Sequence, residues 1–256
     1  MGLPQELIDH ITDMLHGNLP ALKACSLTCK AMFASTRHLI HQTLYLVPQN
    51  MQDAFADKHG FLQYTRRVSI LHHTFTLSAL QLHLQKFQSL DRVHTLILEG
   101  HDVSAWTSRY RLCFAHFHPT LTSLTLRRPF GSFQLIFQFA LQFPILENLC
   151  LEEVQLGTRF EPDPIDLVEM SPPLKHLRVA GCTPSERWPV SLTHEIQSSM
   201  TFRSVEVVDL AGSLACYMLD ACAHTLEALT VVLRGTGMER FSFPSLLQQD
   251  DNLTFL

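Results

Sequence analysis

Histidine is the residue type with the most obvious capacity for chemistry here, because 15 histidines occur among 256 residues. The closest groupings are His72 with His73, His116 with His118, and His94 with His101. None of them has the histidine and glutamate spacing of a zinc hydrolase helix. The segment 234–237, Arg-Gly-Thr-Gly, has neither the length nor the lysine of a phosphate-binding loop. We therefore expect no enzymatic activity, no metal and no cofactor.

Cysteine is the second candidate for chemistry, and its distribution indicates packing. An odd, scattered set favours a reducing compartment over a disulfide framework. Cys25 and Cys29 share a helical face, and apolar packing explains them better than a metal site does. The seven cysteines are Cys25, Cys29, Cys113, Cys150, Cys182, Cys216 and Cys222.

The charge balance excludes broad classes of partner. The net charge is −5 and charged residues make up 17% of the chain, so no basic field exists to neutralise phosphates. The amino terminus carries Glu6, Asp9 and Asp13, which do not suit a secretory signal. The longest uncharged run, 129–146, contains two prolines and a glycine, which argues against a membrane span. We expect a soluble protein of the cytoplasm or nucleus, without nucleic-acid or membrane partners.

One pattern of apolar residues, which we call the repeated phrase, recurs along most of the chain, and the elements it predicts must position the histidine and cysteine side chains. It consists of an apolar residue, two variable residues, an apolar residue, one variable residue and a third apolar residue. Successive copies lie 24–28 residues apart, inside the roughly 20–29-residue period of leucine-rich repeats. The middle residues of the copies are Leu44, Val68, Leu96, Leu124, Leu149, Leu177, Val205, Leu229 and Leu256.

The segments between these phrases complete the predicted repeating unit. Segments 78–90, 108–118, 132–142 and 213–224 carry apolar residues at three- and four-residue steps, which predicts helices. Segment 161–173 contains four prolines and is expected to form a loop. Strands joined by such crossovers predict an α/β solenoid, with a curved parallel sheet inside and helices on the convex side. A doubly wound sheet is the alternative, but it needs no fixed period.

The repeats are irregular at two places. Where leucine-rich repeats usually carry asparagine or cysteine, three residues after the third apolar position, this chain has other residues except Cys182. At its end, 253–256 starts a repeat without finishing it, so we expect a solenoid that is incomplete at the carboxyl terminus. The residues at the asparagine place are His101, Pro129, Val154, Cys182 and Leu210.

Two rows of variable residues are predicted to line the concave side, because strand side chains alternate in direction. Their charges are expected to pair between strands, and the apolar residues Ala180, Val208 and Val232 to form an exposed strip that receives a partner. One row is Glu99, Arg127, Glu152, Ala180, Val208 and Val232. The other is Ile97, Thr125, Cys150, Arg178, Glu206 and Thr230. From both rows we select, as substrate-binding candidates, Glu99, Arg127, Glu152, Arg178, Ala180, Glu206, Val208 and Val232.

The first 45 residues form a separate predicted unit of short helices. Leu7, Ile8, Ile11, Met14 and Leu15 make a stripe at helical spacing, and Gly17-Asn18 closes it. A unit this small buries little apolar surface and tends to need a partner. A helical cap that only seals the open end of the solenoid is the alternative.

The same segment resembles an F-box, in the divergent form found in fungal F-box proteins with repeat domains. The resemblance lies in Leu3-Pro4, Glu6-Leu7-Ile8, Ile11, Leu15, Leu22, the segment 25–30 (Cys-Ser-Leu-Thr-Cys-Lys) and Phe33. It implies binding to the Skp-type adaptor that links F-box proteins to the cullin scaffold of an SCF ubiquitin ligase. The implied adaptor contacts are Leu3, Pro4, Leu7, Ile8, Ile11, Leu22, Leu27, Cys29 and Phe33.

The sequence therefore predicts a two-part receptor, with residues 1–45 docking the adaptor and residues 46–256 holding a protein substrate. The main alternative is a repeat scaffold that binds partners without a ligase. An enzyme with an unrecognised site is a third possibility. The substrate itself is not specified by the sequence.

Overall fold

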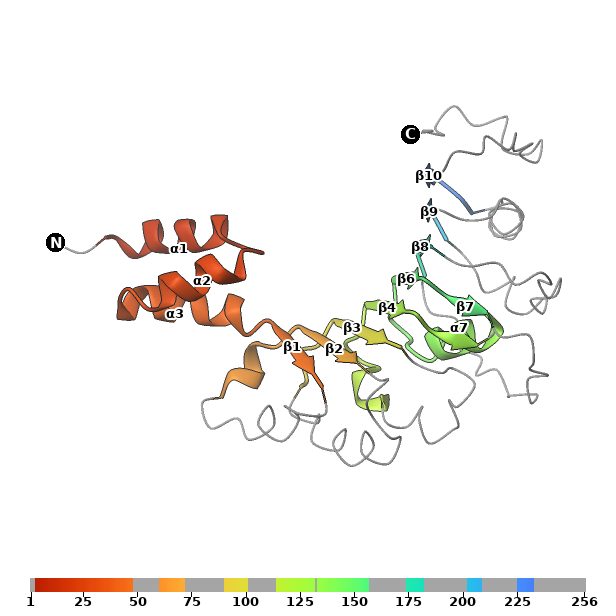
Figure 1. Cartoon of the computed structure of the whole chain (residues 1–256), viewed down its shortest axis with the longest axis horizontal. Helices are drawn as coiled ribbons and strands as arrows, with labels where there is room; N and C mark the ends of the chain where they lie inside the picture. Colours follow the sequence, from red (N-terminus) through yellow and green to blue (C-terminus); the bar gives the residue numbers. More distant parts are fainter. Residues whose placement is uncertain are drawn as a thin grey trace.

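The chain begins with three helices and continues as a stack of strands in the computed structural model (Figure 1). The helices are α1 (Gln5–Met14), α2 (Leu19–Ser26) and α3 (Lys30–Ile40). The side chain of Asn18 caps α2 by accepting a hydrogen bond from the Ala21 N–H at 3.1 Å. The structure describes residues 3–47, 60–71, 90–100, 114–131, 133–156, 174–181, 202–208 and 225–232.

Within the described residues, eight strands form one parallel sheet in which each strand pairs with the preceding strand of that sheet. That order is the order of a solenoid, and it differs from a doubly wound sheet, where the strand order reverses. The strands line the inner side of an arc, and α7 (Phe133–Ala140) lies on its outer side (Figure 1). They are β1 (Thr43–Leu46), β2 (Arg67–Leu71), β3 (Thr95–Glu99), β4 (Ser123–Arg127), β6 (Asn148–Glu152), β8 (His176–Ala180), β9 (Ser204–Val208) and β10 (Ala228–Val232).

The register confirms the repeated phrase. Eight of the nine predicted middle residues are described, and they are successive Cα partners in the series Leu44, Val68, Leu96, Leu124, Leu149, Leu177, Val205 and Leu229. All of them are buried except Leu44, which is partly buried against the same core. The third residues form a second buried row, namely Leu46, Ile70, Leu98, Leu126, Leu151, Val179 and Val207. The core is therefore a ladder of equivalent side chains.

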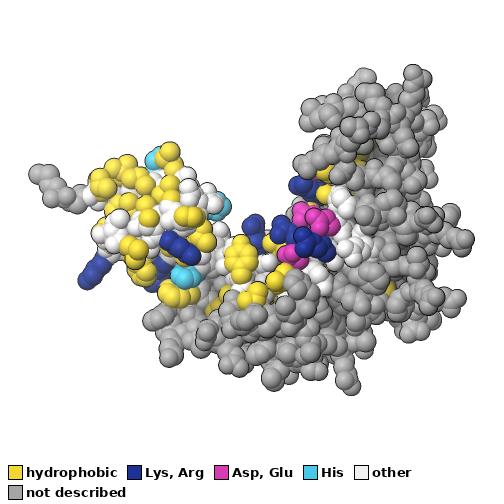
Figure 2. All heavy atoms as spheres, viewed as in Figure 1, with side chains coloured by type: hydrophobic (Ala, Val, Ile, Leu, Met, Phe, Trp, Pro, Cys, Tyr) yellow, Lys and Arg dark blue, Asp and Glu magenta, His cyan; other side chains and the backbone are white. Residues whose placement is uncertain are grey.

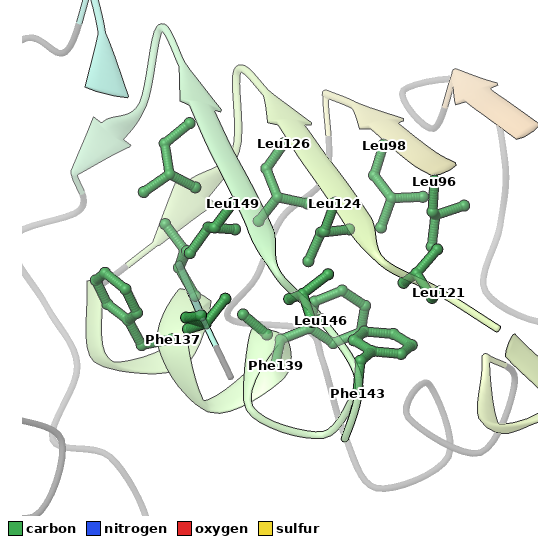
Figure 3. Packing of buried hydrophobic residues seen from close by; sticks show 14 of the residues in the cluster. Leu96, Leu98, Leu121, Leu124, Leu126, Phe137, Phe139, Phe143, Leu146 and Leu149 are labelled. Carbon is green, nitrogen blue, oxygen red and sulfur yellow. The ribbon is translucent and has the colours of Figure 1, made fainter. Parts of the chain in front are cut away.

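The outer layer of this core contains many aromatic side chains. Phe137 and Phe139 of α7 are buried together with Phe143, on the same side of the sheet as the strand leucines (Figure 3). The rings of Phe139 and Phe143 meet edge to face at 5.4 Å, which is a favoured aromatic geometry. Helix α7 lies within the predicted helical segment 132–142. That part of the prediction is confirmed.

The predicted helix over 108–118 differs from the structure where the structure describes it. Residues Ala115–Phe117 form the 3₁₀ helix η5 instead of an α-helix. Phe114 and Phe117 are both fully buried, and side chains three residues apart eclipse one another in a 3₁₀ helix. Pro119 follows at once and cannot extend a regular α-helix. The remaining predicted segments, 78–89, 161–173, 213–224 and 253–256, lie outside the described residues.

The backbone after four neighbouring strands adopts the left-handed conformation. Two of these positions are glycines, Gly100 and Gly181, but Arg128 (φ +50°) and Glu153 (φ +53°) are not. Each of the four N–H groups donates a hydrogen bond to the next strand, at 2.8–3.0 Å, and so extends the ladder by one step. The conformation costs roughly 1–2 kcal/mol for a residue with a Cβ. The place expected for asparagine, one residue later at Val154, is filled by a buried apolar side chain.

The three-helix unit is joined to the first strands through the end of α3. The Arg37 guanidinium donates a hydrogen bond to the Tyr64 hydroxyl and lies 4.7 Å from the centre of its ring. His41 stacks on Phe61 with ring centres 3.9 Å apart, and both aromatic partners belong to the 3₁₀ helix η1 (Phe61–Tyr64). A two-stranded parallel pair, β5 (Phe130–Gly131) and β7 (Gln155–Leu156), completes the described elements.

Candidate partner-binding surfaces

The interior of the three-helix unit is small and partly polar. Its buried hydrophobic side chains, within residues 3–40, are Ile8 and Leu22, at 4% and 2% exposure. Thr12, Ser35 and Thr36 are buried with them, and exposed Asp9 accepts hydrogen bonds from the Ser35 hydroxyl at 2.7 Å and from Gln5 Nε2 at 2.8 Å. Both hydrogen bonds lower the pKa of the Asp9 carboxyl, and the bond from Ser35 has the larger effect. The Ser35 bond also links α1 to α3.

The surface of this unit is unusually apolar. Six of the eight large hydrophobic residues that are exposed in the described part of the chain belong to it. Their exposures range from 38% at Leu19 to 87% at Leu27. Hydrophobic side chains gather over the helices in the space-filling view (Figure 2). We call this set the apolar helical surface: Leu3, Leu7, Met14, Leu19, Leu27 and Phe33.

The implied adaptor contacts divide into exposed and buried residues. Leu3, Leu7, Leu27 and Phe33 belong to the apolar helical surface, and Pro4 and Cys29 are also exposed. Ile11 is half-buried. Ile8 and Leu22 are buried, so they pack inside the unit and offer no free surface to a partner. Met14 and Leu19 were not among the implied adaptor contacts: Met14 belongs to the predicted stripe of the first helix, and Leu19 begins α2, and neither is part of the F-box resemblance.

Cys29 and Cys150 are two thiols with opposite surroundings. Exposed Cys29 precedes α3, where its sulfur accepts the Met32 N–H at 3.5 Å, and this hydrogen bond lowers the thiol pKa. Cys150 lies on the inner face of β6, where burial first and then the nearby Glu152 raise its pKa to about 11. The two thiols should therefore differ in reactivity, because only the thiolate is nucleophilic.

We expect iodoacetamide at pH 7 to alkylate Cys29 at least about tenfold faster than Cys150, because the thiolate fraction changes tenfold per pKa unit. Peptide mapping over time measures both rates in the same sample. Cys29→Ser removes the fast site while retaining an oxygen that caps α3. Equal labelling of the two cysteines would contradict the described surroundings.

The predicted inner rows of the sheet are confirmed as register rows. Glu99, Arg127, Glu152, Ala180, Val208 and Val232 are successive Cα partners, as are Ile97, Thr125, Cys150, Arg178, Glu206 and Thr230. Two of the expected charge pairs form, Arg127 with Glu152 at 2.8 Å and Arg178 with Glu206 at 3.8 Å. Charged side chains gather in the concave part of the molecule (Figure 2).

One predicted pairing is replaced by a different one. Glu99 lies beside Arg127 in the register, yet it pairs with Arg128 at 3.8 Å. Arg128 also binds Glu153 at 2.7 Å, and the two Glu neighbours raise its pKa. Arg128 and Glu153 were missed because a strand pattern does not reveal that the next residue turns left-handed. Arg128 is exposed, so solvent screens both pairs and they contribute little to stability.

The expected apolar strip needs correction. Val208 is only 8% exposed, Ala180 is partly exposed, and the Val232 side chain lies outside the described residues. On the inner side of a curved sheet neighbouring side chains converge, and Val208 lies between the in-register positions 180 and 232. A substitution at Val208 would therefore disturb packing as well as any partner contact.

The described histidines of the pair at positions 116 and 118 pack against phenylalanine rings. His118 meets the ring edge of Phe143 at 5.3 Å, and its burial lowers its pKa. His116 packs against Phe117 with ring centres 4.0 Å apart. Across the described ranges, no group of three or more His, Cys, Asp or Glu side chains is placed to hold a metal ion. His72, His73 and His101 lie outside those ranges.

Comparison with known proteins adds no relative to this picture. No protein-family model matches the sequence, and the searches of curated proteins and of solved structures gave no significant match. Among the helices that the structure describes, none is long and apolar enough to cross a membrane. The class of the protein therefore follows from its architecture, which is an α/β repeat solenoid of parallel strands preceded by three helices.

Proposed function

We propose that this chain is the substrate-recognition subunit, an F-box receptor, of an SCF-type ubiquitin ligase. The helical unit binds a Skp-type adaptor, which links it to a cullin scaffold, and the leucine-rich-repeat-like sheet binds a protein substrate. The observation that carries the proposal is the apolar helical surface on a small unit in front of a solenoid.

The exposed apolar side chains favour a stable partner over a simple cap. A cap seals the core with a polar outer face, whereas this unit presents leucines, a methionine and a phenylalanine to solvent. Burying such surface contributes about 25 cal/mol per Å². Since Ile8 and Leu22 are the only hydrophobic side chains buried within residues 3–40, a partner would add substantially to the core of the unit.

The proposed mechanism is positioning. A receptor raises the effective concentration of a substrate near the ligase-bound ubiquitin conjugate and needs no side-chain chemistry of its own. The contacts of Arg37 with Tyr64 and of His41 with Phe61 hold the end of α3 against the solenoid. They support a fixed geometry between the adaptor and the bound substrate.

Adaptor binding is the direct test. Leu7→Asp and Leu27→Asp, made singly, should each weaken binding to a purified Skp-type adaptor by about 2 kcal/mol, or roughly thirtyfold, because each places a charge in an apolar interface. Isothermal titration calorimetry gives the affinities. Ile145→Asp is the matched control, since Ile145 is a 38% exposed aliphatic residue in the solenoid.

The result separates the two readings of the helical unit. Wild-type and Ile145→Asp proteins should bind the adaptor equally well. If the wild-type chain does not bind any Skp-type adaptor, the proposal fails and a scaffold without a ligase becomes the better explanation.

A further inference from the structure

The first strands of the solenoid carry arginines that have no acidic partner among the described residues. In the described segments 60–71 and 90–100, the cations Arg66, Arg67 and Arg92 occur with the acids Asp91 and Glu99, and Glu99 pairs with Arg128. No ion pair involves Arg66, Arg67, Arg92 or Asp91 within the described parts of the chain. This local excess of positive charge occurs in a chain whose net charge is −5. We call Arg66, Arg67 and Arg92 the basic patch.

Arginines on or next to later strands form ion pairs with glutamates. Arg127, Arg178 and Arg203 each have a glutamate partner on the following strand or just before it. Arg67 instead lies between Thr43 and Thr95 in the register. The nearest acid on β3 is Glu99, at the other end of the strand, and it pairs with Arg128.

Arg66 gives a second, independent indication. Its Nη1 nitrogen is shielded from solvent and has no hydrogen-bond partner. Leaving such a donor unpaired is costly, and the cost is larger for a charged group. The residue as a whole is only half-buried, so part of its side chain stays exposed to solvent.

An aromatic side chain lies near the basic patch. Tyr45 of β1 is 61% exposed and shares a register row with Ser69 and Ile97. Arg67 and Tyr45 lie two register positions apart, on the same inner face of the sheet. The first strands therefore combine cations with an aromatic surface, a composition typical of binding hot spots.

We infer that the basic patch and Tyr45 bind an acidic peptide segment of the captured protein, with carboxylates on the arginines and an apolar side chain against Tyr45. The assignment rests on the proposed function for its biological context and names the chemistry of the substrate. Because the contacts are charged and exposed, binding should weaken as salt is raised.

The test uses the full chain and a fluorescein-labelled peptide of glutamates interrupted by leucine and phenylalanine. A matched peptide has glutamine at every glutamate position. Fluorescence anisotropy should show preference for the glutamate peptide, and Arg66→Ala with Arg67→Ala should reduce its affinity by at least about tenfold. Arg203→Ala is the control, because Arg203 occupies the position equivalent to Arg66 in a later repeat; its effect should be under about twofold.

Several outcomes would overturn the assignment. Equal affinity for the two peptides, or equal losses in the Arg66/Arg67 and Arg203 variants, would exclude an acidic-peptide site. Binding that requires phosphoserine in place of glutamate would assign the patch to phosphate, and binding only to phosphatidylserine vesicles would assign it to a membrane surface. Thermal melting of each variant identifies loss of folding, and Arg67→Lys should retain most of the affinity.

Adaptor binding measured on the same samples keeps the two proposals apart. The Arg66/Arg67 variant should bind the adaptor as the wild type does. Loss of peptide binding with intact adaptor binding supports a substrate site, whereas peptide binding by a chain that never binds the adaptor contradicts the ligase and leaves the basic patch as a scaffold's docking site.

Discussion

Phe139→Ala is expected to lower the free energy of unfolding of the solenoid by about 3–5 kcal/mol, the usual cost of truncating a buried phenylalanine. Phe139 is 2% exposed and meets two other rings edge to face, Phe114 at 5.8 Å and Phe143 at 5.4 Å. It therefore links the outer layers of two successive repeats. Its loss leaves a cavity between repeats, where a solenoid has no other core to compensate.

Urea unfolding followed by circular dichroism measures this effect. Phe33→Ala is the matched control, since Phe33 is 45% exposed on the helical unit, and its effect on solenoid stability should stay within about 0.5 kcal/mol. A loss below about 1 kcal/mol for Phe139→Ala would mean that the ring is not part of a close-packed layer.

Ile8→Ala should unfold the helical unit while the solenoid stays folded. Ile8 is one of two buried hydrophobic residues in the unit, and its truncation costs about 2–5 kcal/mol. Three short helices with so small a core have little stability to lose. Adaptor binding would then disappear although Ile8 offers no surface to the adaptor.

Hydrogen exchange detected by mass spectrometry distinguishes this local unfolding from a global one. Amides of α1, α2 and α3 should lose protection in Ile8→Ala, while those of β3, β4 and β6 keep it. Met14→Ala, at a residue that is 74% exposed, should leave both regions protected. Persistent protection of all three helices in Ile8→Ala would show that the unit has another source of stability.

The repeated apolar phrase predicted the sheet because every strand carries the same spacing of buried apolar residues. Leu96, Leu124 and Leu149 are equivalent in spacing, and equivalent spacing in a stack means equivalent register. The inner rows followed from the same argument, since side chains alternate along a strand. The pairing of Arg127 with Glu152 was therefore predictable before any coordinates.

Features set by the backbone outside the strands were not predictable in the same way. Arg128 and Glu153 take a conformation that favours glycine, so neither their role in hydrogen bonding nor their ion pair follows from residue type. The burial of Val208 depends on sheet curvature, which the period does not give. In the helices, periodicity identified the apolar stripe but not that Ile8 faces inward while Leu7 and Met14 face solvent.

The register of the parallel ladder can be tested with one native cysteine. Thr125 and Cys150 are Cα partners on β4 and β6, and neighbouring strands lie about 4.8 Å apart, within the Cα range that a disulfide spans. Thr125→Cys should therefore cross-link to Cys150 on oxidation. Ser123→Cys is the control, because Ser123 pairs with Asn148, two positions away from Cys150.

Peptide mapping after oxidation at alkaline pH, where the Cys150 thiol with its pKa of about 11 begins to ionise, gives the decisive measurement. The stacked solenoid predicts a bond between Cys150 and the cysteine at position 125, and none to a cysteine at position 123. Cross-linking of the position-123 variant, or no cross-link in either variant, would contradict the ladder on which the inner rows of the sheet and the basic patch depend.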